Sequence, residues 1–205
     1  MSEPADGLRE YDEWRASRDE RLTDGARPEF CVRRITDVDV LPEGIADTKV
    51  EILRLDPGPT TAGRPPRGRK HGDLVHALLA HAAFPPDRIG IEALATVHEI
   101  GSRMPAGTRQ QAVDLVVRTF AHPLVSSALQ SQRVHREYPV TYDANGELHE
   151  GVIDLVSFDG SGWTVLDYKT GPGDEPRYRR QVAIYGEIIR KTMAAPVRLV
   201  VLEIA

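Results

Sequence analysis

The stretch GVIDLVSFDGSGWTVLDYKTG, residues 151–171, predicts two β-strands joined by a tight turn. Its Val, Ile, Leu, Phe and Trp residues are typical of strands that pack against a core. Three charged residues interrupt these strands: Asp154, Asp167 and Lys169. A buried charge is costly unless it is paired or binds a metal, so these three residues are the first candidates for function.

The turn at residues 160–161, Gly-Ser, determines how the two strands pair. A two-residue loop there predicts an antiparallel hairpin in which Asp154 lies directly across from Asp167. Because side chains alternate between the faces of a strand, Lys169 shares a face with Asp167. The same face carries large apolar residues nearer the turn: Val156, Phe158, Trp163 and Val165. This face is therefore expected to have a packed end and a charged end.

An Asn-Gly pair at residues 145–146 predicts a second hairpin, which adds a third strand. By the same count Glu137 lies opposite Asp154, although a bulged turn would shift this register by one residue. Like charges placed directly opposite one another destabilise a sheet, and the apolar neighbours argue against a face that is simply solvated. A divalent cation resolves the conflict, because Mg²⁺ and Mn²⁺ prefer hard oxygen ligands. Lys169 would then orient the attacking water or neutralise charge on a phosphate.

The rest of the chain predicts an α/β fold. Helical patterns cover residues 8–22 and 72–84, two stretches that start at Asp87 and at Thr108 (with a break near Pro123), and residues 176–193. Strand patterns cover residues 28–38, 133–143, 147–159, 162–170 and 196–204. The long helix before the last strand can act as a crossover, so the last strand can run parallel to an earlier one. Residues 56–70 are rich in Pro, Gly and basic residues and predict a flexible loop.

The composition limits the classes of function. The 205 residues suit one domain with a substantial core, and the net charge of −5 argues against a protein that coats nucleic acid by charge alone. No run of about 18 apolar residues is present, and the acidic start MSEPADGLREYDEW lacks the features of a secretory signal. We therefore expect a cytoplasmic protein. The single cysteine, Cys31, excludes an internal disulfide and a four-cysteine iron–sulfur cluster.

The charged residues also follow a recognisable order. Asp154 followed by Asp167-Tyr168-Lys169 resembles the D…D-x-K signature of the PD-(D/E)XK nuclease superfamily. More closely, the chain resembles the RecB/AddA-type nuclease domain of bacterial helicase–nucleases, because five motif pieces occur in family order. These pieces are GDLVHALL at residues 72–79, Glu137 in REYPV, GVIDLV, VLDYKTG, and Q-x-x-x-Y at Gln181 and Tyr185. D-x-K alone is a weak signal, whereas five pieces in order are specific.

The resemblance implies a restriction-endonuclease-like core, with a mixed central sheet flanked by helices and an N-terminal helical region. It implies three side-chain ligands for Mg²⁺ or Mn²⁺, helped by one backbone carbonyl: His76, Asp154 and Asp167, and Tyr168. It also implies four further active-site residues: the catalytic Lys169, an acid at Glu137, and Gln181 and Tyr185, which would organise the site or contact DNA.

The implied reaction is metal-dependent hydrolysis of phosphodiester bonds in DNA, which we expect to be exonucleolytic and linked to recombination and double-strand-break repair. The substrate would be single-stranded DNA or duplex ends. The chain has no GxxxxGK(S/T) phosphate loop, so a UvrD/AddA-like helicase is an expected partner. Residues 1–55 are expected to form an extension that resembles the connector from helicase to nuclease, residues 56–70 the loop, and residues 71–205 the nuclease domain.

Alternatives exist for the whole chain and for single residues. The chain could be a nuclease-like DNA-binding or protein-docking module that has lost catalysis, but the complete set of motif residues favours an active enzyme. A small-molecule metalloenzyme would need polar recognition groups that the sequence does not reveal. Without the resemblance, His76 would be read as an ordinary core histidine. Gln181 and Tyr185, four residues apart, would be read as a half-buried helix stripe.

Overall fold

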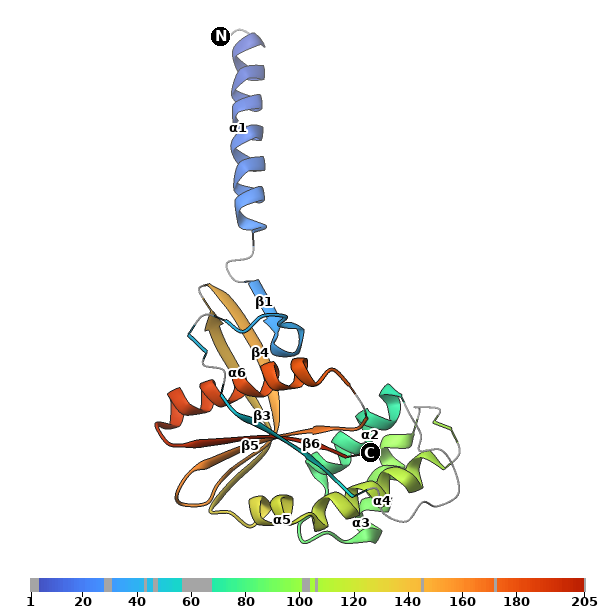
Figure 1. Ribbon diagram of the computed structural model, residues 1–205. Coiled ribbons are helices and arrows are strands. Elements are labelled where there is room, and N and C mark those ends of the chain that lie inside the picture. The colour runs from blue at the N-terminus through green and yellow to red at the C-terminus, as the bar shows by residue number, and fades with distance from the viewer. Residues whose placement is uncertain are drawn as a thin grey trace.

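The computed structural model describes residues 4–27, 31–42, 44–45, 48–56, 68–100, 104–105, 107–144, 146–171 and 173–204. Its elements follow in this order: α1 (Pro4–Gly25), β1 (Cys31–Arg34), the 3₁₀ helix η1 (Ile35–Asp37), β2 (Val50–Arg54), α2 (Arg69–His81), α3 (Arg88–Glu99), α4 (Thr108–Ala121), α5 (Pro123–Leu129), β3 (Arg133–Ala144), β4 (Glu147–Phe158), β5 (Trp163–Lys169), α6 (Glu175–Met193) and β6 (Val197–Glu203). Figure 1 shows that these elements form the expected α/β fold, a sheet flanked by helices.

The described strands form one six-stranded mixed sheet. Its order is β1-β4-β5-β6-β2, and β3 pairs with β4 outside this path. The pairs β3–β4 and β4–β5 are antiparallel, as predicted, whereas β5–β6, β2–β6 and β1–β4 are parallel. Helix α6 is the crossover between β5 and β6, which confirms the expected role of the long helix. Strand β2 was not predicted, and its five residues VEILR form a strand by pairing with β6.

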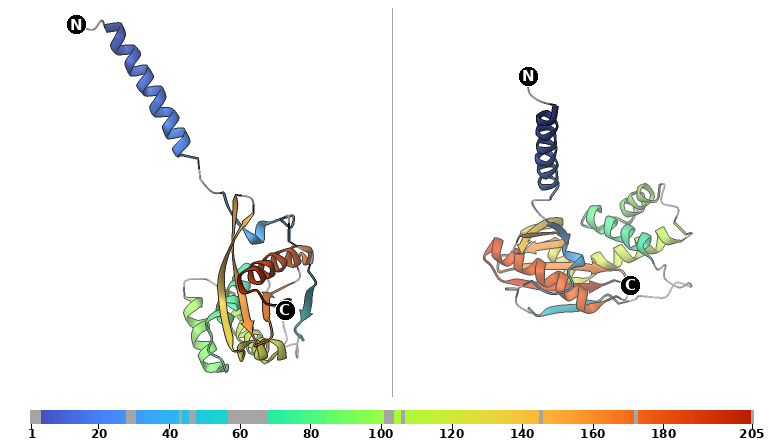
Figure 2. Two further views of the ribbon diagram at one scale, coloured as in Figure 1. Left: turned by 90° about the vertical axis from the view of Figure 1, so that its left-hand side faces the viewer. Right: turned by 90° about the horizontal axis from the view of Figure 1, so that it is seen from above.

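Helices cover both faces of the sheet, as Figure 2 shows from two further directions. On one face the buried residues of α6 form an apolar cluster with Val156, Trp163 and Val165 of the β4–β5 hairpin. On the other face, residues of α2, α3, α4 and α5 surround Leu155 and Leu166 in a second cluster. Burial of these two clusters is the main driving force for folding.

The β3–β4 hairpin changes faces along its length. In β4, Ile153 belongs to the α6 cluster, whereas Leu155 belongs to the cluster on the opposite face. In β3, Val134 packs on the α2–α5 side and Tyr138 on the α6 side. Regular alternation would place residues two apart on one face, so both strands rotate here, and Glu137 lies at the rotation point with φ of 52°.

Helix α1 stands away from the rest of the molecule in the views of Figures 1 and 2. The sequence predicts this helix, but its apolar residues Leu8, Tyr11, Trp14 and Leu22 are all more than half exposed. Neither apolar cluster of the described residues includes an α1 residue. None of the described helices, α1 included, combines the length and apolar character that a membrane crossing requires.

The N-terminal third of the chain contributes directly to the sheet. Strands β1 and β2 lie within the expected extension of residues 1–55, and both pair with strands of the central sheet. Residues 57–67 of the expected loop 56–70 lie outside the described residues. The division of the chain at residues 55 and 70 therefore stays a prediction.

The close contact between α6 and β6 leads to a stability prediction. A Cβ at Gly186 would clash with the side chain of Leu199, which is itself buried. We expect Gly186→Ala to lower the free energy of unfolding by about 1–3 kcal/mol, although alanine favours a helix by about 1 kcal/mol over glycine. Urea unfolding measures the change. The matched control is Gly90→Ala in α3, where a Cβ meets only ordinary contacts, and an equal loss there would contradict the packing argument.

Candidate active site

Three side chains with metal-ligand chemistry meet where β3 and β4 rotate. They come from three elements: His76 from α2, Glu137 from β3 and Asp154 from β4, and one ligand atom of each lies within 4.8 Å of the others. His76 Nδ1 is 3.2 Å from Asp154 Oδ1. The structure therefore brings together a histidine and two carboxylates that are far apart in the sequence.

The predicted hairpin registers are confirmed. Ala144 pairs with Glu147 on either side of the second turn, and Tyr138 pairs with Ile153, so the count places Glu137 opposite Asp154. The turn residue Asn145 lies outside the described residues. In the first hairpin, Phe158 pairs with Trp163 and Leu155 with Leu166. The ladder ends there, and one further step of the same count places Asp154 opposite Asp167.

Asp154 interrupts the ladder between β4 and β5. Its Oδ2 accepts a hydrogen bond from the backbone N–H of Tyr168 at 2.7 Å. The same carboxylate faces His76 through Oδ1, so it joins β4 to β5 and contacts α2. The ring of Tyr168 is edge-on to the His76 imidazole, with 6.4 Å between ring centroids.

Glu137 has an unusual backbone. Its φ of 52° lies in the left-handed region, which residues other than glycine occupy rarely and at a cost of about 1–2 kcal/mol. Although the side chain is exposed, partial burial of the carboxyl raises its pKa, and the negative charge of Asp154 raises it further. The strain and the charge repulsion are both concentrated at the residue that completes the cluster.

Beside this cluster is a second group of polar residues, from β5 and α6. Asp167 is 2% exposed, and its Oδ2 is 2.6 Å from Nζ of Lys169. The amide nitrogen of Gln181 donates to Asp167 Oδ1 at 3.1 Å and to the hydroxyl of Tyr185 at 3.2 Å. Lys169 donates to the amide oxygen of Gln181 at 3.1 Å. The predicted pair Gln181 and Tyr185 therefore lies on one helix face and connects to both charged residues of β5.

The structure divides the predicted ligands between these two groups. His76 and Asp154 lie together with Glu137, which the resemblance implies only as a further acid, whereas Asp167 is engaged with Lys169 and Gln181. Among the described residues, Asp167 Oδ2 has an ion-pair partner but no partner in hydrogen-bond geometry. Burial, and then the charge of Asp154, raise the pKa of Asp167 to about 6.

These residues fit a divalent cation. Two carboxylates and an imidazole within a few ångströms are a suitable donor set for Mg²⁺ or Mn²⁺, and the buried Asp167 lacks full hydrogen-bond compensation among the described residues. Burial lowers the pKa of His76, but the charge and hydrogen bond of Asp154 outweigh this effect and raise it overall. The charge of Asp154 contributes to the raised pKa of His76, Glu137 and Asp167 alike, and a cation would offset this charge.

A cavity of about 330 Å³ adjoins the site. Its lining includes His76, Tyr168 and Lys169, together with Gly68, Arg69, Gly72, Asp73, Thr170, Gly171 and Tyr178. A Cβ at Gly72 would lie 2.8 Å from Thr170 Oγ1, so the glycine of the GDLVHALL motif lets α2 approach the end of β5.

Sequence reasoning does not identify Tyr178 as a site residue. Its ring centre is 4.8 Å from Lys169 Nζ, and the residue lines the cavity. A signal was available, because Tyr178 precedes Gln181 by three residues and such positions share a helix face.

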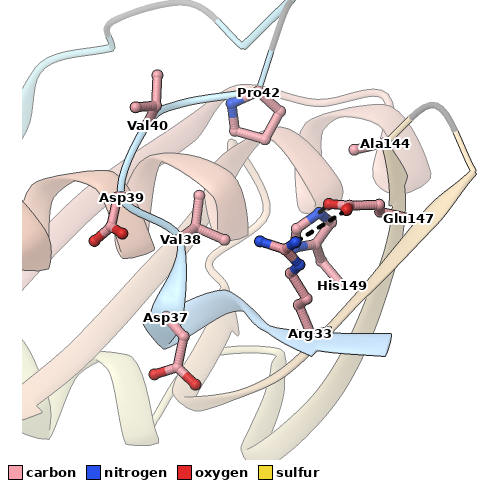
Figure 3. A pocket seen from close by; sticks show the side chains of 9 residues that line it. All are labelled: Arg33, Asp37, Val38, Asp39, Val40, Pro42, Ala144, Glu147 and His149. Carbon is pink, nitrogen blue, oxygen red and sulfur yellow. Dashed lines mark ion pairs between the residues drawn. The ribbon is translucent and has the colours of Figure 1, made fainter. Parts of the chain in front are cut away.

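A larger cavity, of about 380 Å³, lies elsewhere, between the residues after β1 and the far end of the β3–β4 hairpin (Figure 3). Glu147 lines this cavity and is ion-paired with Arg33 at 3.3 Å and close to His149 at 3.7 Å. The other lining residues are Asp37, Val38, Asp39, Val40, Pro42 and Ala144. Since no predicted site residue lines this cavity, size alone does not identify the site here.

The positive φ of Glu137 predicts that substitution by glycine rather than alanine has opposite effects on stability at two positions of the sheet. Glycine relieves left-handed strain, so Glu137→Gly should be more stable than Glu137→Ala by about 1 kcal/mol. The matched pair is Glu150→Gly and Glu150→Ala in β4, where glycine should be less stable by about 0.5–1 kcal/mol because the backbone is ordinary strand. Urea unfolding in EDTA measures all four. A less stable glycine at position 137 would show that the strain is absent.

The raised pKa of Asp167 leads to a prediction for the metal-free protein. A carboxyl whose folded pKa is about 6, against an ordinary value near 4, takes up a proton on folding between these pH values. Its contribution to stability therefore falls as pH rises through this window. The free energy of unfolding of Asp167→Asn, taken relative to that of wild type, should rise by about 1–3 kcal/mol between pH 4 and pH 7. Urea unfolding in EDTA at the two pH values tests this, and an unchanged difference would refute it.

Comparisons with known proteins show which family the chain is similar to. The family model of the PD-(D/E)XK nuclease superfamily matches residues 50–204. The A subunit of the ATP-dependent helicase/nuclease from Desulforamulus reducens is 27% identical over 169 residues, which cover 71% of this chain and 13% of that protein. Proteins of the same name from Bacillus cytotoxicus and Anoxybacillus flavithermus are 26% and 29% identical, over 63% and 58% of this chain and 13% and 11% of their own lengths.

The chain thus spans only a small part of these relatives. The family model, by contrast, matches most of the length of this chain. The matched range includes every predicted site residue, from His76 to Tyr185. The motif pieces in the sequence, the match to the family model and the expected mixed sheet therefore all point to the same family. On these grounds the chain belongs to the PD-(D/E)XK nuclease superfamily.

Proposed function

We propose that this chain is a metal-dependent DNA nuclease that hydrolyses phosphodiester bonds. The observation that carries the proposal is that one member of each group lines the same cavity: His76, which lies with Glu137 and Asp154, and Lys169, which is ion-paired with Asp167. One group has the chemistry to hold a cation, and the other presents an ammonium group. Both kinds of group promote phosphodiester hydrolysis, because each offsets negative charge that develops on the phosphate.

The cation would be held by the histidine–carboxylate cluster, and we keep Asp167 and the Tyr168 carbonyl as proposed further ligands. When bound, Mg²⁺ or Mn²⁺ supplies Lewis-acid chemistry that activates water and offsets phosphate charge. His76 must be neutral to act as a ligand. Its hydrogen bond with Asp154 fixes the ring orientation, which supports a ligand role over that of an ordinary core histidine.

Lys169 is held as a charged group at the cavity. Its Nζ lies between Asp167 Oδ2 and the amide oxygen of Gln181, over the ring of Tyr178. This fixed ammonium can orient the attacking water or stabilise charge that develops on the phosphate. The lysine side chain is 18% exposed, which is enough to reach a substrate in the cavity that it lines.

Gln181 and Tyr185 are proposed to organise the site. Tyr185 is 1% exposed, and burial raises the pKa of its phenol, so the hydroxyl stays protonated and inaccessible to DNA. Gln181 contacts Asp167, Lys169 and that hydroxyl. Of the two roles expected for this pair, burial therefore favours the positioning of Lys169 over direct contact with DNA.

The cellular role is proposed from the relatives. They are named as A subunits of the ATP-dependent helicase/nuclease, which supports a role beside a UvrD/AddA-like helicase in DNA recombination and repair. We also propose that digestion is exonucleolytic, on single strands or duplex ends.

The test compares two lysine variants on DNA. Wild type, Lys169→Ala and Lys191→Ala are incubated with end-labelled linear single- and double-stranded DNA and a circular single strand, with Mg²⁺, Mn²⁺ or EDTA. We expect Lys169→Ala to reduce metal-dependent cleavage by about 100–1000-fold while it keeps its Tm. Lys191, more than half exposed beside Glu187, is the matched control and should leave cleavage unchanged.

The outcomes separate the alternatives. Cleavage of the linear strands with sparing of the circle identifies an exonuclease. Metal binding by calorimetry without cleavage points to a docking module or to a requirement for the helicase. Equal activity of wild type and Lys169→Ala, or neither cleavage nor metal binding, refutes the proposed function.

A further inference from the structure

Arg136 occupies a place that the nuclease motifs do not explain. It directly precedes Glu137 in β3, and its Nη1 donates to two backbone carbonyls of another element, Leu79 at 3.0 Å and Ala82 at 2.6 Å. Both acceptors belong to the end of α2, the helix that carries His76. One guanidinium therefore links the strand of one cluster residue to the helix of another.

The contact provides hydrogen-bond donors for carbonyl groups at the end of α2. The last carbonyls of an α-helix lack partners within the helix and carry partial negative charge. The helix ends at His81, where the backbone N–H of Ala82 returns to Leu78. Arg136 bonds two other carbonyls of this turn with a group that is always protonated. Such charge-assisted bonds are stronger and more directional than neutral ones.

The geometry around Arg136 connects it to His76. Leu79, whose carbonyl it binds, follows His76 by three residues, so the two residues lie on the same side of the helix about one turn apart. Helix α2 otherwise packs mainly against α4 and α3. Because Glu137 reverses the backbone with its positive φ, Arg136 points toward the α2 layer while Tyr138 joins the α6 layer.

We propose that Arg136 is a positioning residue that sets the separation of His76 and Glu137, and through it the affinity of the cluster for a divalent cation. The inference rests on the proposed function in one respect, namely that the cluster binds a cation. Arg136 itself touches neither the cation nor the substrate. It acts by fixing α2 against β3.

The test uses three variants of the full chain: Arg136→Met, Arg136→Lys and the control Arg179→Met. Arg179 also donates a guanidinium bond to a distant carbonyl, Val50 at 2.6 Å, but on β2. Isothermal titration with Mn²⁺ alone should show affinity reduced about 10–100-fold for Arg136→Met, as for other groups that orient metal ligands. Arg136→Lys keeps the positive charge on a side chain that is one bond shorter and should recover part of the loss, and Arg179→Met should bind as wild type does.

A structural role alone predicts a different result. Arg136→Met would then lose stability to urea, as Arg179→Met does, and bind Mn²⁺ with the affinity of wild type, which would overturn the inference. An equal loss of affinity in Arg179→Met would also overturn it. If Arg136→Met does not fold, Arg136→Lys decides, because full affinity in a variant with a shorter side chain and no guanidinium contradicts the proposed positioning role.

A second measurement separates this inference from the proposed function. If wild type binds no Mn²⁺, the proposed metal site is refuted. The positioning role of Arg136 is then tested by crystal structures of the metal-free variants. The inference predicts that Arg136→Met, or Arg136→Lys if the methionine variant does not fold, shifts α2 and lengthens the 3.2 Å contact between His76 and Asp154. An unchanged contact would overturn it.

Discussion

The carboxylate of Asp154 joins three elements of the described structure: β4, β5 and α2. One oxygen accepts the N–H of Tyr168 and replaces a rung of the β4–β5 ladder, and the other meets His76 on α2. The bond to Tyr168 holds the end of β5, where Lys169 lines the cavity and pairs with the buried Asp167. A partly buried carboxylate is stable only with such partners. The candidate site is thus built around a side chain that also takes part in the pairing of the strands.

The charges of the site are unbalanced in the protein alone. Three carboxylates, Glu137, Asp154 and Asp167, lie near one lysine and one histidine, and Asp154 raises the pKa of each of the other two. Strain at Glu137 adds to this cost. Strain and like-charge crowding persist at functional sites because the rest of the structure supports them. Here that support is the pair of apolar clusters on the two faces of the sheet.

Much of this arrangement could be predicted from the sequence, because two short turns determine register by counting. The opposition of Asp154 with Asp167 and with Glu137 follows from the turn residues alone. The counting failed where it assumed flat strands: the rotation between Ile153 and Leu155 depends on packing against two different layers. That rotation brings Glu137, rather than Asp167, into the group with His76. The contacts of Arg136 join residues more than 50 positions apart, and no local pattern reports them. The exposure of the apolar side of α1 could not be predicted either, because the hydrophobic period of a helix does not show what its apolar face contacts.

The two groups of the site differ in how far apart their residues are in the sequence, because the crossover helix α6 directly follows the strand that carries Lys169. Lys169 and Gln181 are 12 residues apart, so their contact closes a short loop between neighbouring elements. His76 and Asp154 are 78 residues apart, and closing a longer loop costs more conformational entropy. Contacts of high sequence separation also form slowly in folding. The lysine half can therefore assemble from one contiguous hairpin–helix unit, whereas the histidine half requires a contact across 78 residues of chain. The proposed cation site is thus complete only after these long-range contacts have formed.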